Sequence, residues 1–327
     1  MRELLLLLCR YPFDEANRAT LSKLLSEVQD WHKLVELVNA HGIIALAAYN
    51  IREARLEKII PKDAMAVLDN GRMQCMIRNT WLVQRWKEVN KILTDAEIKH
   101  VLLKGMALEH KVYGAKGLRQ MSDNDILVKK NNVMKAWFLL QEHGFVPDMT
   151  KSPLYFKIIT EIGNHIPALR KENYSVEIHH RLFYEPERNE SLDEAIDNAV
   201  MIEIEGEHAF VLKDDIHLDF LKKHLQHHLI SGNAELKLFN DIELISPGSA
   251  PPFPAGFLLN PNSSENPIQK KRSYRTHFYS LPWNIRFRFL IGDIFPSLKW
   301  MKKRYKCNGI KVFLYYPERI GKLIWLI

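Results

Sequence analysis

Three acidic side chains in two short segments have the types and spacing of a divalent-cation site. Asp123 and Asp125 lie in residues 120–128, which the residue pattern predicts to be a strand entered from a loop. Alternate side chains of a strand point to the same face, so the two carboxylates converge. Adjacent like charges repel unless a cation lies between them, and Mg²⁺ prefers oxygen ligands. The pair therefore predicts a metal site, although Asp-x-Asp alone also suits turn capping or solvent exposure.

A second alternating segment, residues 175–182, supplies a third carboxylate at Glu177. One face of this predicted strand carries Ser175, Glu177, His179 and Arg181, and the other carries Val176, Ile178, His180 and Leu182. If the two strands are neighbours, the three carboxylates complete a metal site for phosphoryl-group chemistry. His179 is a candidate for substrate contact, and so is His165; an ordinary surface position is the alternative for both.

The elements around these strands include a phosphate-binding turn. Residues 101–103 are predicted to be a buried strand and residues 106–113 a helix, with Gly105 at the junction and Lys104 before it. A strand–Gly–helix junction presents backbone N–H groups and the positive end of a helix dipole to a phosphate. A second helix, predicted over residues 131–142, follows the Asp strand and stops at Gly144.

The order of these elements resembles the DNA polymerase β-like nucleotidyltransferase superfamily, and more closely its bacterial branch described as uncharacterised nucleotidyltransferases. The matching segments are residues 103–105, 118–128, 140–145 and 176–182, and the resemblance covers about residues 30–245. It implies an α+β fold, a small mixed sheet with flanking helices, here with additional N- and C-terminal helical regions. It also implies transfer of a nucleoside monophosphate from a nucleoside triphosphate such as ATP to a hydroxyl acceptor, with release of pyrophosphate.

The resemblance assigns roles to individual residues of this chain. Asp123, Asp125 and Glu177 match the catalytic carboxylates that hold Mg²⁺ or Mn²⁺. The nucleotide contacts are expected from Lys104, Gly105, Arg119, Ser122 and His179. Lys104-Gly105 replaces the usual Gly-Ser turn, so one hydroxyl contact to phosphate is missing, and Lys104, Arg119 or Ser122 is expected to replace it.

Charge is distributed unevenly along the 327 residues, whose net charge is +7. Residues 266–327 hold 14 of the 46 Lys and Arg residues and 2 of the 39 Asp and Glu residues, so they carry +12 while the rest carries −5. Aromatic residues are interleaved with these basic residues, which favours an anionic partner: the inner face of the membrane or a nucleic acid. Helices packed on the body with solvated basic faces are the alternative.

Composition and periodicity divide the chain into four parts. Residues 1–95 are predicted to be helical, 96–245 to be the transferase core with a following helix, 246–267 a Pro/Ser/Asn-rich linker or loop, and 268–327 a basic aromatic region. Three scattered cysteines give neither a disulfide framework nor a zinc site. The apolar run at residues 4–9 is too short for a signal sequence or membrane span and is expected to be the buried side of a helix.

These features predict a cytoplasmic enzyme, with a peripheral place at the inner membrane face through the basic region. The alternatives are a non-catalytic binding or regulatory protein with the same fold, and an RNA-modifying transferase. The acceptor stays open among a sugar, an antibiotic-like small molecule, a protein hydroxyl and an RNA end. His224 and His228, four residues apart in a predicted helix over residues 214–230, can share a metal, but polar helix surface is the favoured interpretation.

Overall fold

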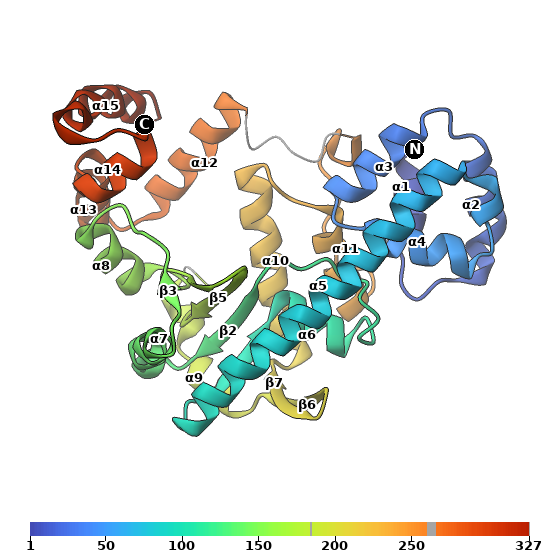
Figure 1. Ribbon diagram of the computed structural model, residues 1–327, viewed down its shortest axis with the longest axis horizontal. Helices are drawn as coiled ribbons and strands as arrows, with labels where there is room; N and C mark the ends of the chain where they lie inside the picture. The colour runs from blue at the N-terminus through green and yellow to red at the C-terminus, as the bar shows by residue number, and fades with distance from the viewer. Residues whose placement is uncertain (184, 260–265, 327) are drawn as a thin grey trace. The chain divides into compact units, whose positions relative to one another are not determined.

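The computed structural model describes residues 1–183, 185–259 and 266–326 (Figure 1). Contacts within the chain define two compact units. The first comprises Met1–Lys91, Val101–Asp125 and Asp197–Ser263, and the second comprises Ile92–His100, Ile126–Ile196 and Ser264–Ile327. The four-part division was based on composition and periodicity and not on contacts, so it stays a prediction.

The N-terminal helices of the first unit begin and end at residues that favour helix boundaries. α3 (Trp31–Ala40) follows Asp30, whose carboxylate accepts the N–H of Lys33 at 2.8 Å, and the chain leaves this helix through Gly42 at a φ of +68°. An Asp that caps the first turn and a Gly in the left-handed region after the last turn are typical helix boundaries. The other elements of this segment are α1 (Arg2–Leu8), η1 (Glu15–Asn17), α2 (Arg18–Ser26), α4 (Ile44–Glu53), η2 (Glu57–Ile59) and α5 (Lys62–Asp95).

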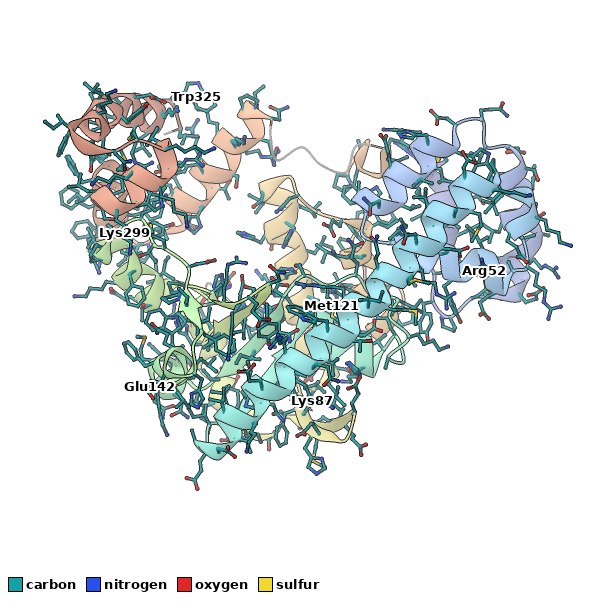
Figure 2. The ribbon with its side chains drawn as sticks, in the orientation of Figure 1. Arg52, Lys87, Met121, Glu142, Lys299 and Trp325 are labelled. Carbon is teal, nitrogen blue, oxygen red and sulfur yellow. The ribbon has the colours of Figure 1, made fainter. Side chains whose placement is uncertain are left out.

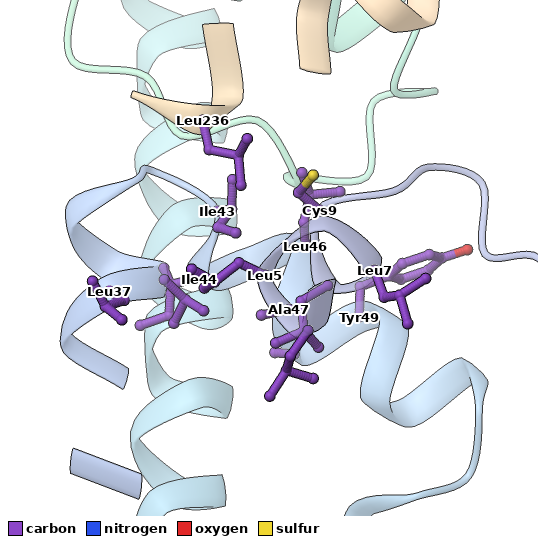
Figure 3. Close-up of a cluster of buried hydrophobic side chains, with 14 of the residues drawn as sticks. Leu5, Leu7, Cys9, Leu37, Ile43, Ile44, Leu46, Ala47, Tyr49 and Leu236 are labelled. Atoms are coloured by element: carbon purple, nitrogen blue, oxygen red, sulfur yellow. The ribbon is translucent and has the colours of Figure 1, made fainter. Parts of the chain in front are cut away.

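The core of the first unit lies where α1, α4 and α11 (Leu236–Ile245) meet (Figure 3). Every residue of α4 from Ile44 to Ile51 is buried, including Asn50. The side-chain amide of Asn50 donates to the carbonyls of Leu7, Leu8 and Arg10 at 3.3, 2.9 and 2.8 Å. These carbonyls lie at the end of α1, where intrahelical donors run out, so one buried amide satisfies them.

α5 is a single helix of 34 residues, within the region that was predicted to be helical. Gly71 permits its close approach to α4, because a Cβ there would lie 2.5 Å from Cδ1 of Ile44. Trp86 is fully buried on this helix, whereas Met76 is 46% exposed.

Seven strands form one mixed sheet in the order β3-β4-β5-β2-β1-β7-β6, which confirms the predicted α+β class. β1 and β7 pair in parallel, with Leu102 opposite Val211, while the β3–β4, β4–β5 and β6–β7 pairs are antiparallel. The strands are β1 (His100–Leu103), β2 (Asn124–Val128), β3 (Val146–Pro147), β4 (Leu169–Lys171), β5 (Tyr174–His179), β6 (Val200–Ile204) and β7 (Glu207–Val211). The two strands predicted at residues 120–128 and 175–182 are thus β2 and β5, each shorter than expected.

The remaining helices connect and flank the strands. α6 (Lys104–Lys111) follows β1 directly, as the predicted strand–Gly–helix order requires. The others are η3 (Lys130–Asn132), α7 (Val133–Glu142), α8 (Pro153–Ile162), η4 (Pro186–Asn189), α9 (Leu192–Asp197), α10 (Asp214–Ser231), η5 (Phe257–Leu259), α12 (Pro267–Ser280), α13 (Trp283–Ile294), α14 (Leu298–Tyr305), η6 (Gly309–Leu314) and α15 (Tyr315–Leu326). Of the linker expected at residues 246–267, residues 260–265 lie outside the described residues, and the described part contains only η5 and the start of α12.

The C-terminal helices of the second unit are anchored on a buried carboxylate. Asp293 of α13 is 1% exposed and accepts hydrogen bonds from Tyr274 at 3.0 Å and Arg319 at 2.8 Å; Lys151 pairs with it as well. Beside this network, α13 packs on α8 through a cluster formed by Ile158, Phe278, Leu281, Ile285 and Phe289 (Figure 1). The basic aromatic region is therefore a set of packed helices.

Candidate metal and nucleotide site

Lys104 occupies the predicted phosphate turn and forms an ion pair with one of the predicted metal ligands. It is the first residue of α6 and has a φ of +46°, in the left-handed region that a Cβ disfavours. Its Nζ lies 2.6 Å from Oδ1 of Asp125 on β2, and the two side chains are 16% and 5% exposed. Backbone strain of this kind is retained where the surroundings fix a functional geometry. The ammonium group shows that a positive charge is accommodated beside Asp125.

Asp125 also belongs to a cluster with Glu177 and His179 on β5, the strand next to β2. One potential ligand atom from each of the three residues lies within 4.8 Å of the other two. Carboxylate oxygens suit Mg²⁺ and Mn²⁺, while an imidazole nitrogen is a more general divalent-metal ligand. The donor set therefore fits a divalent cation without selecting its identity.

Glu177 is placed between two imidazole rings. Its Oε2 lies 3.6 Å from Nε2 of His179 and 3.9 Å from Nε2 of His165, and the ring centroids of the two histidines are 5.1 Å apart. An isolated antiparallel bridge pairs His165 with His179, which brings the 163–165 loop to the end of β5. The alternation that places Glu177 and His179 on one face is thereby confirmed.

The segment that precedes β2 carries Ser122 and Asp123 and is held by α5. Ser122 Oγ donates to Oδ1 of Asp123 at 3.1 Å, and the Ser122 carbonyl accepts from Nη2 of Arg78 at 2.6 Å. Asn79 donates to the Arg119 carbonyl at 3.0 Å, so consecutive α5 residues fix both ends of the segment. Asp123 is adjacent in sequence to β2 but is not part of the cluster that Asp125, Glu177 and His179 form among the described residues. Its metal role stays a prediction.

Arg119 forms a buried ion pair with Asp241 within the first unit. Its Nε donates to both carboxylate oxygens of Asp241 at 3.0 and 3.1 Å, and its Nη2 donates to Oδ2 at 2.7 Å. The side chains are 7% and 0% exposed. Burial by itself would lower the pKa of Arg119, but the Asp241 carboxylate outweighs it and the net shift is upward. Tyr113 donates a further hydrogen bond to Oδ1 of Asp241 at 3.0 Å.

This geometry gives Arg119 a structural partner that the sequence did not indicate, so its role as a phosphate clamp stays a prediction. Glu109 on α6 reinforces the same region, because its carboxylate accepts the backbone N–H of Arg119 at 2.9 Å and also pairs with the N–H of Gly117. Burial raises the pKa of Glu109, and these N–H groups partly oppose the shift.

Gly105 is a packing position as well as a predicted phosphate contact. A Cβ there would lie 2.8 Å from Cγ and Sδ of Met121 and 2.9 Å from Nη1 of Arg119. Met121 is labelled in Figure 2. Because Arg119 is fixed by its ion pair, a side chain at position 105 would displace the segment that leads to Asp125.

Two histidines of α10 lie closer to this site than the sequence indicated. His224 and His228 are half-buried, with ring centroids 4.3 Å apart, and their interpretation as polar helix surface stays a prediction. Burial lowers the pKa of His224, and the next largest contribution is the positive charge of Lys104. The four-residue spacing of the two histidines indicated that they share one face of the helix. It could not show that this face lies near Lys104.

The eight predicted site residues thus separate into three groups. The structure brings together Lys104, Asp125, Glu177 and His179. Arg119, Ser122 and Asp123 lie on the segment that leads to β2, and Gly105 packs against that segment. Asp241 is an additional residue that sequence reasoning missed.

A sheet that carries clustered carboxylates beside a strand–Lys-Gly–helix turn is the architecture expected of a nucleotidyltransferase. The family model described as "Uncharacterised nucleotidyltransferase" matches residues 27–254, and the chain belongs to this family. The match confirms the expected family but does not extend to α12–α15. No curated protein matches the chain.

Proposed function

We propose that this protein is a metal-dependent nucleotidyltransferase that moves a nucleoside monophosphate from a triphosphate such as ATP to a hydroxyl acceptor. The observation that carries the proposal is the position of Asp125, which lies 2.6 Å from the Lys104 ammonium and within 4.8 Å of Glu177 and His179. The Asp125 carboxylate thus has a second carboxylate, an imidazole and an ammonium group as neighbours, and the ammonium group belongs to the first residue of α6. Family membership supports the same reaction class.

The acidic residues of the site would hold the metal and accept the proton of the acceptor. Asp125, Glu177 and the predicted ligand Asp123 would hold Mg²⁺ or Mn²⁺, which supplies a positive charge for the triphosphate and the departing pyrophosphate. The acceptor oxygen attacks the α-phosphorus and forms a P–O bond, while the bond from that phosphorus to the bridging oxygen breaks. The acceptor proton passes to a base, and we assign this role to Glu177, which is 24% exposed and so open to a substrate.

Lys104 and the N-terminus of α6 would bind the phosphates. Nζ of Lys104 is already next to Asp125, and the backbone of Gly105 lies in the first turn of α6. Phosphate oxygens offer the ammonium a second anionic partner, and the helix N–H groups favour the same charge. Ser122 and His179 remain proposed contacts of the nucleotide.

We propose that the acceptor binds in an open cavity of about 660 Å³ within the first unit, between α3 and α5. The cavity reaches Gln120 and Met121, the two residues before Ser122, and Arg78 connects its wall to the Ser122 carbonyl. Its lining includes Trp31, Val35, Glu36, Asn39, Asp63, Asn70 and Gln74. Amides beside an aromatic ring and two carboxylates fit a neutral or cationic small molecule with hydroxyl groups.

This lining also separates the proposed reaction from its alternatives. An RNA end is disfavoured as acceptor, because Arg78 is the only Lys or Arg among the described cavity residues and two carboxylates accompany it. A non-catalytic binding protein would have no chemical need for the clustered ligands Asp125, Glu177 and His179. We propose a cytoplasmic location, where nucleoside triphosphates and divalent cations are available.

The test compares three purified variants with the parent protein. Each is incubated with labelled nucleoside triphosphates, Mg²⁺ or Mn²⁺, and a cell extract as the source of acceptor, and transfer of label is measured. Asp125→Asn should abolish transfer, and Glu177→Gln should lower its rate about 10²–10⁴-fold if Glu177 is the base. Glu172→Gln, in the exposed turn before β5, is the matched control and should retain the parent rate. Parent-like transfer by Asp125→Asn would refute the assignment.

A further inference from the structure

The C-terminal helices expose far more apolar surface than their packed interior explains. Of the 23 large hydrophobic residues that are exposed in the described chain, 13 lie after residue 266. A folded surface rarely concentrates them in this way unless the surface binds something apolar. The interior of the same region is well formed, since Asp293, Phe289 and Met301 are almost completely buried.

The clearest apolar patch is on η6, which follows α14. Ile310 is 84% exposed, Leu314 75% and Phe313 55%, whereas Val312 is 1% exposed. Val312 therefore fixes this short helix to the body of the region while its three neighbours point to solvent. α14 packs on η6, and stacked rings of Tyr305 and Tyr315, 4.3 Å apart, join the two ends of this segment.

Basic side chains accompany the patch, and acidic ones do not. Exposed lysines and arginines lie on α14, after it and on η6, at Lys302, Lys303, Arg304, Lys306 and Lys311. The only two carboxylates after residue 266 are already neutralised, because Asp293 is buried with its donors and Glu318 pairs with Lys322. Nothing in the charge of this region opposes an anionic surface.

We propose that Ile310, Phe313 and Leu314 form the insertion point of a membrane-docking surface whose partner is an anionic lipid bilayer. Apolar side chains enter the boundary between headgroups and acyl chains, while the lysines of α14 and η6 contact lipid phosphates. This is surface attachment, because among the described residues no helix has the length and apolar content needed to cross a bilayer. The family match ends at residue 254, so the docking surface lies outside the region shared with the family.

Bilayer and nucleic acid make different demands on this surface. Both attract lysines, but the exposed aliphatic side chains of Ile310 and Leu314 offer a nucleic acid neither a charge for its phosphates nor a ring for base stacking. A bilayer uses both the charge and the apolar tip. The combination of Ile310 and Leu314 with flanking lysines therefore favours lipid.

The test is flotation of the full chain with vesicles of phosphatidylcholine, with and without phosphatidylglycerol, in the absence of nucleotide. The parent should float with the anionic vesicles only and be released at about 1 M salt, where the screening length falls to about 3 Å. Ile310→Ser/Leu314→Ser should lose most of the binding. Lys302→Gln/Lys303→Gln should weaken it about 25-fold, at roughly fivefold for each lysine.

The matched control is Trp283→Ser/Phe287→Ser, which removes apolar surface from α13, where these residues are 82% and 65% exposed. It should float like the parent, and circular dichroism should show all variants folded. Loss of flotation in the α13 variant with retention in the η6 variant would overturn the proposal. Absence of parent flotation, or RNA displacing the protein from anionic vesicles, would overturn it as well.

Discussion

Replacing Arg119 and Asp241 singly and together tests whether this buried pair is structural or part of the nucleotide site. The guanidinium donates three hydrogen bonds to a carboxylate that is 0% exposed. Removing either partner leaves a buried charge unpaired, which costs about 3–5 kcal/mol. Arg119→Met and Asp241→Leu should each lower the free energy of unfolding by about this amount.

The paired variant Arg119→Met/Asp241→Leu removes both charges and should recover most of the stability. What remains is the hydroxyl of Tyr113, which loses its acceptor on Asp241 but still accepts from Asn240 at 3.0 Å. An unsatisfied buried donor costs about 1–3 kcal/mol. The sum of the two single losses in the free energy of unfolding should therefore exceed the loss in the paired variant by at least about 3 kcal/mol.

Urea unfolding of the four proteins measures these differences, with the midpoint and slope fitted for each. Additive losses, with the paired variant as unstable as the sum of the singles, would refute the buried-pair interpretation. Calorimetry with a non-hydrolysable triphosphate and Mg²⁺ then examines the clamp role. Unchanged affinity in the folded paired variant is expected from a structural Arg119, and lost affinity would restore Arg119 as a phosphate ligand.

Three further experiments test the packing, the acid stability and the acceptor cavity. Gly105→Ala should cost about 1–3 kcal/mol through overpacking, and Met121→Ala should relieve part of it in chemical denaturation. Burial, assisted by Lys111, lowers the pKa of His217 from 6.5 to about 4. The contribution of this residue to the free energy of unfolding is therefore complete above pH 6.5 and is lost as the pH falls toward 4. In His217→Leu, the free energy of unfolding should fall by about 3 kcal/mol less than in the parent over this pH range, and an unchanged pH dependence would contradict the assignment. Val67→Trp should block transfer while preserving triphosphate affinity, whereas Ala66→Trp, on the exposed side of α5 outside the cavity, should change neither; equal transfer by both would exclude the cavity as the acceptor site.

Local sequence patterns determined the elements that carry the site. Alternation around Asp125 and Glu177 predicted two strands, and both are present as β2 and β5. The Lys104-Gly105 junction predicted a strand followed directly by a helix, and β1 passes into α6 there. These features depend on periodicity and on residue preferences over a few positions, which the sequence records directly.

Pairing across the chain was decided by tertiary structure. Arg119 had the chemistry of a phosphate ligand in the sequence, but folding places it against Asp241, 122 residues later. Lys104 and Asp125 are 21 residues apart, and their 2.6 Å contact required β1 and β2 to be neighbours in the sheet. A sequence specifies which charges exist, whereas the partner of each charge depends on which elements pack together.

The C-terminal region shows the same limit for apolar residues. Its composition and net charge of +12 were evident from the sequence, yet aromatic residues at helical spacing suit either a core or a surface. Phe289 became core at 5% exposure, while Ile310 remained 84% exposed on η6. Side chains of equal hydrophobicity are separated only by the space that the packed neighbouring helices leave for them, so burial was a property of the tertiary structure alone.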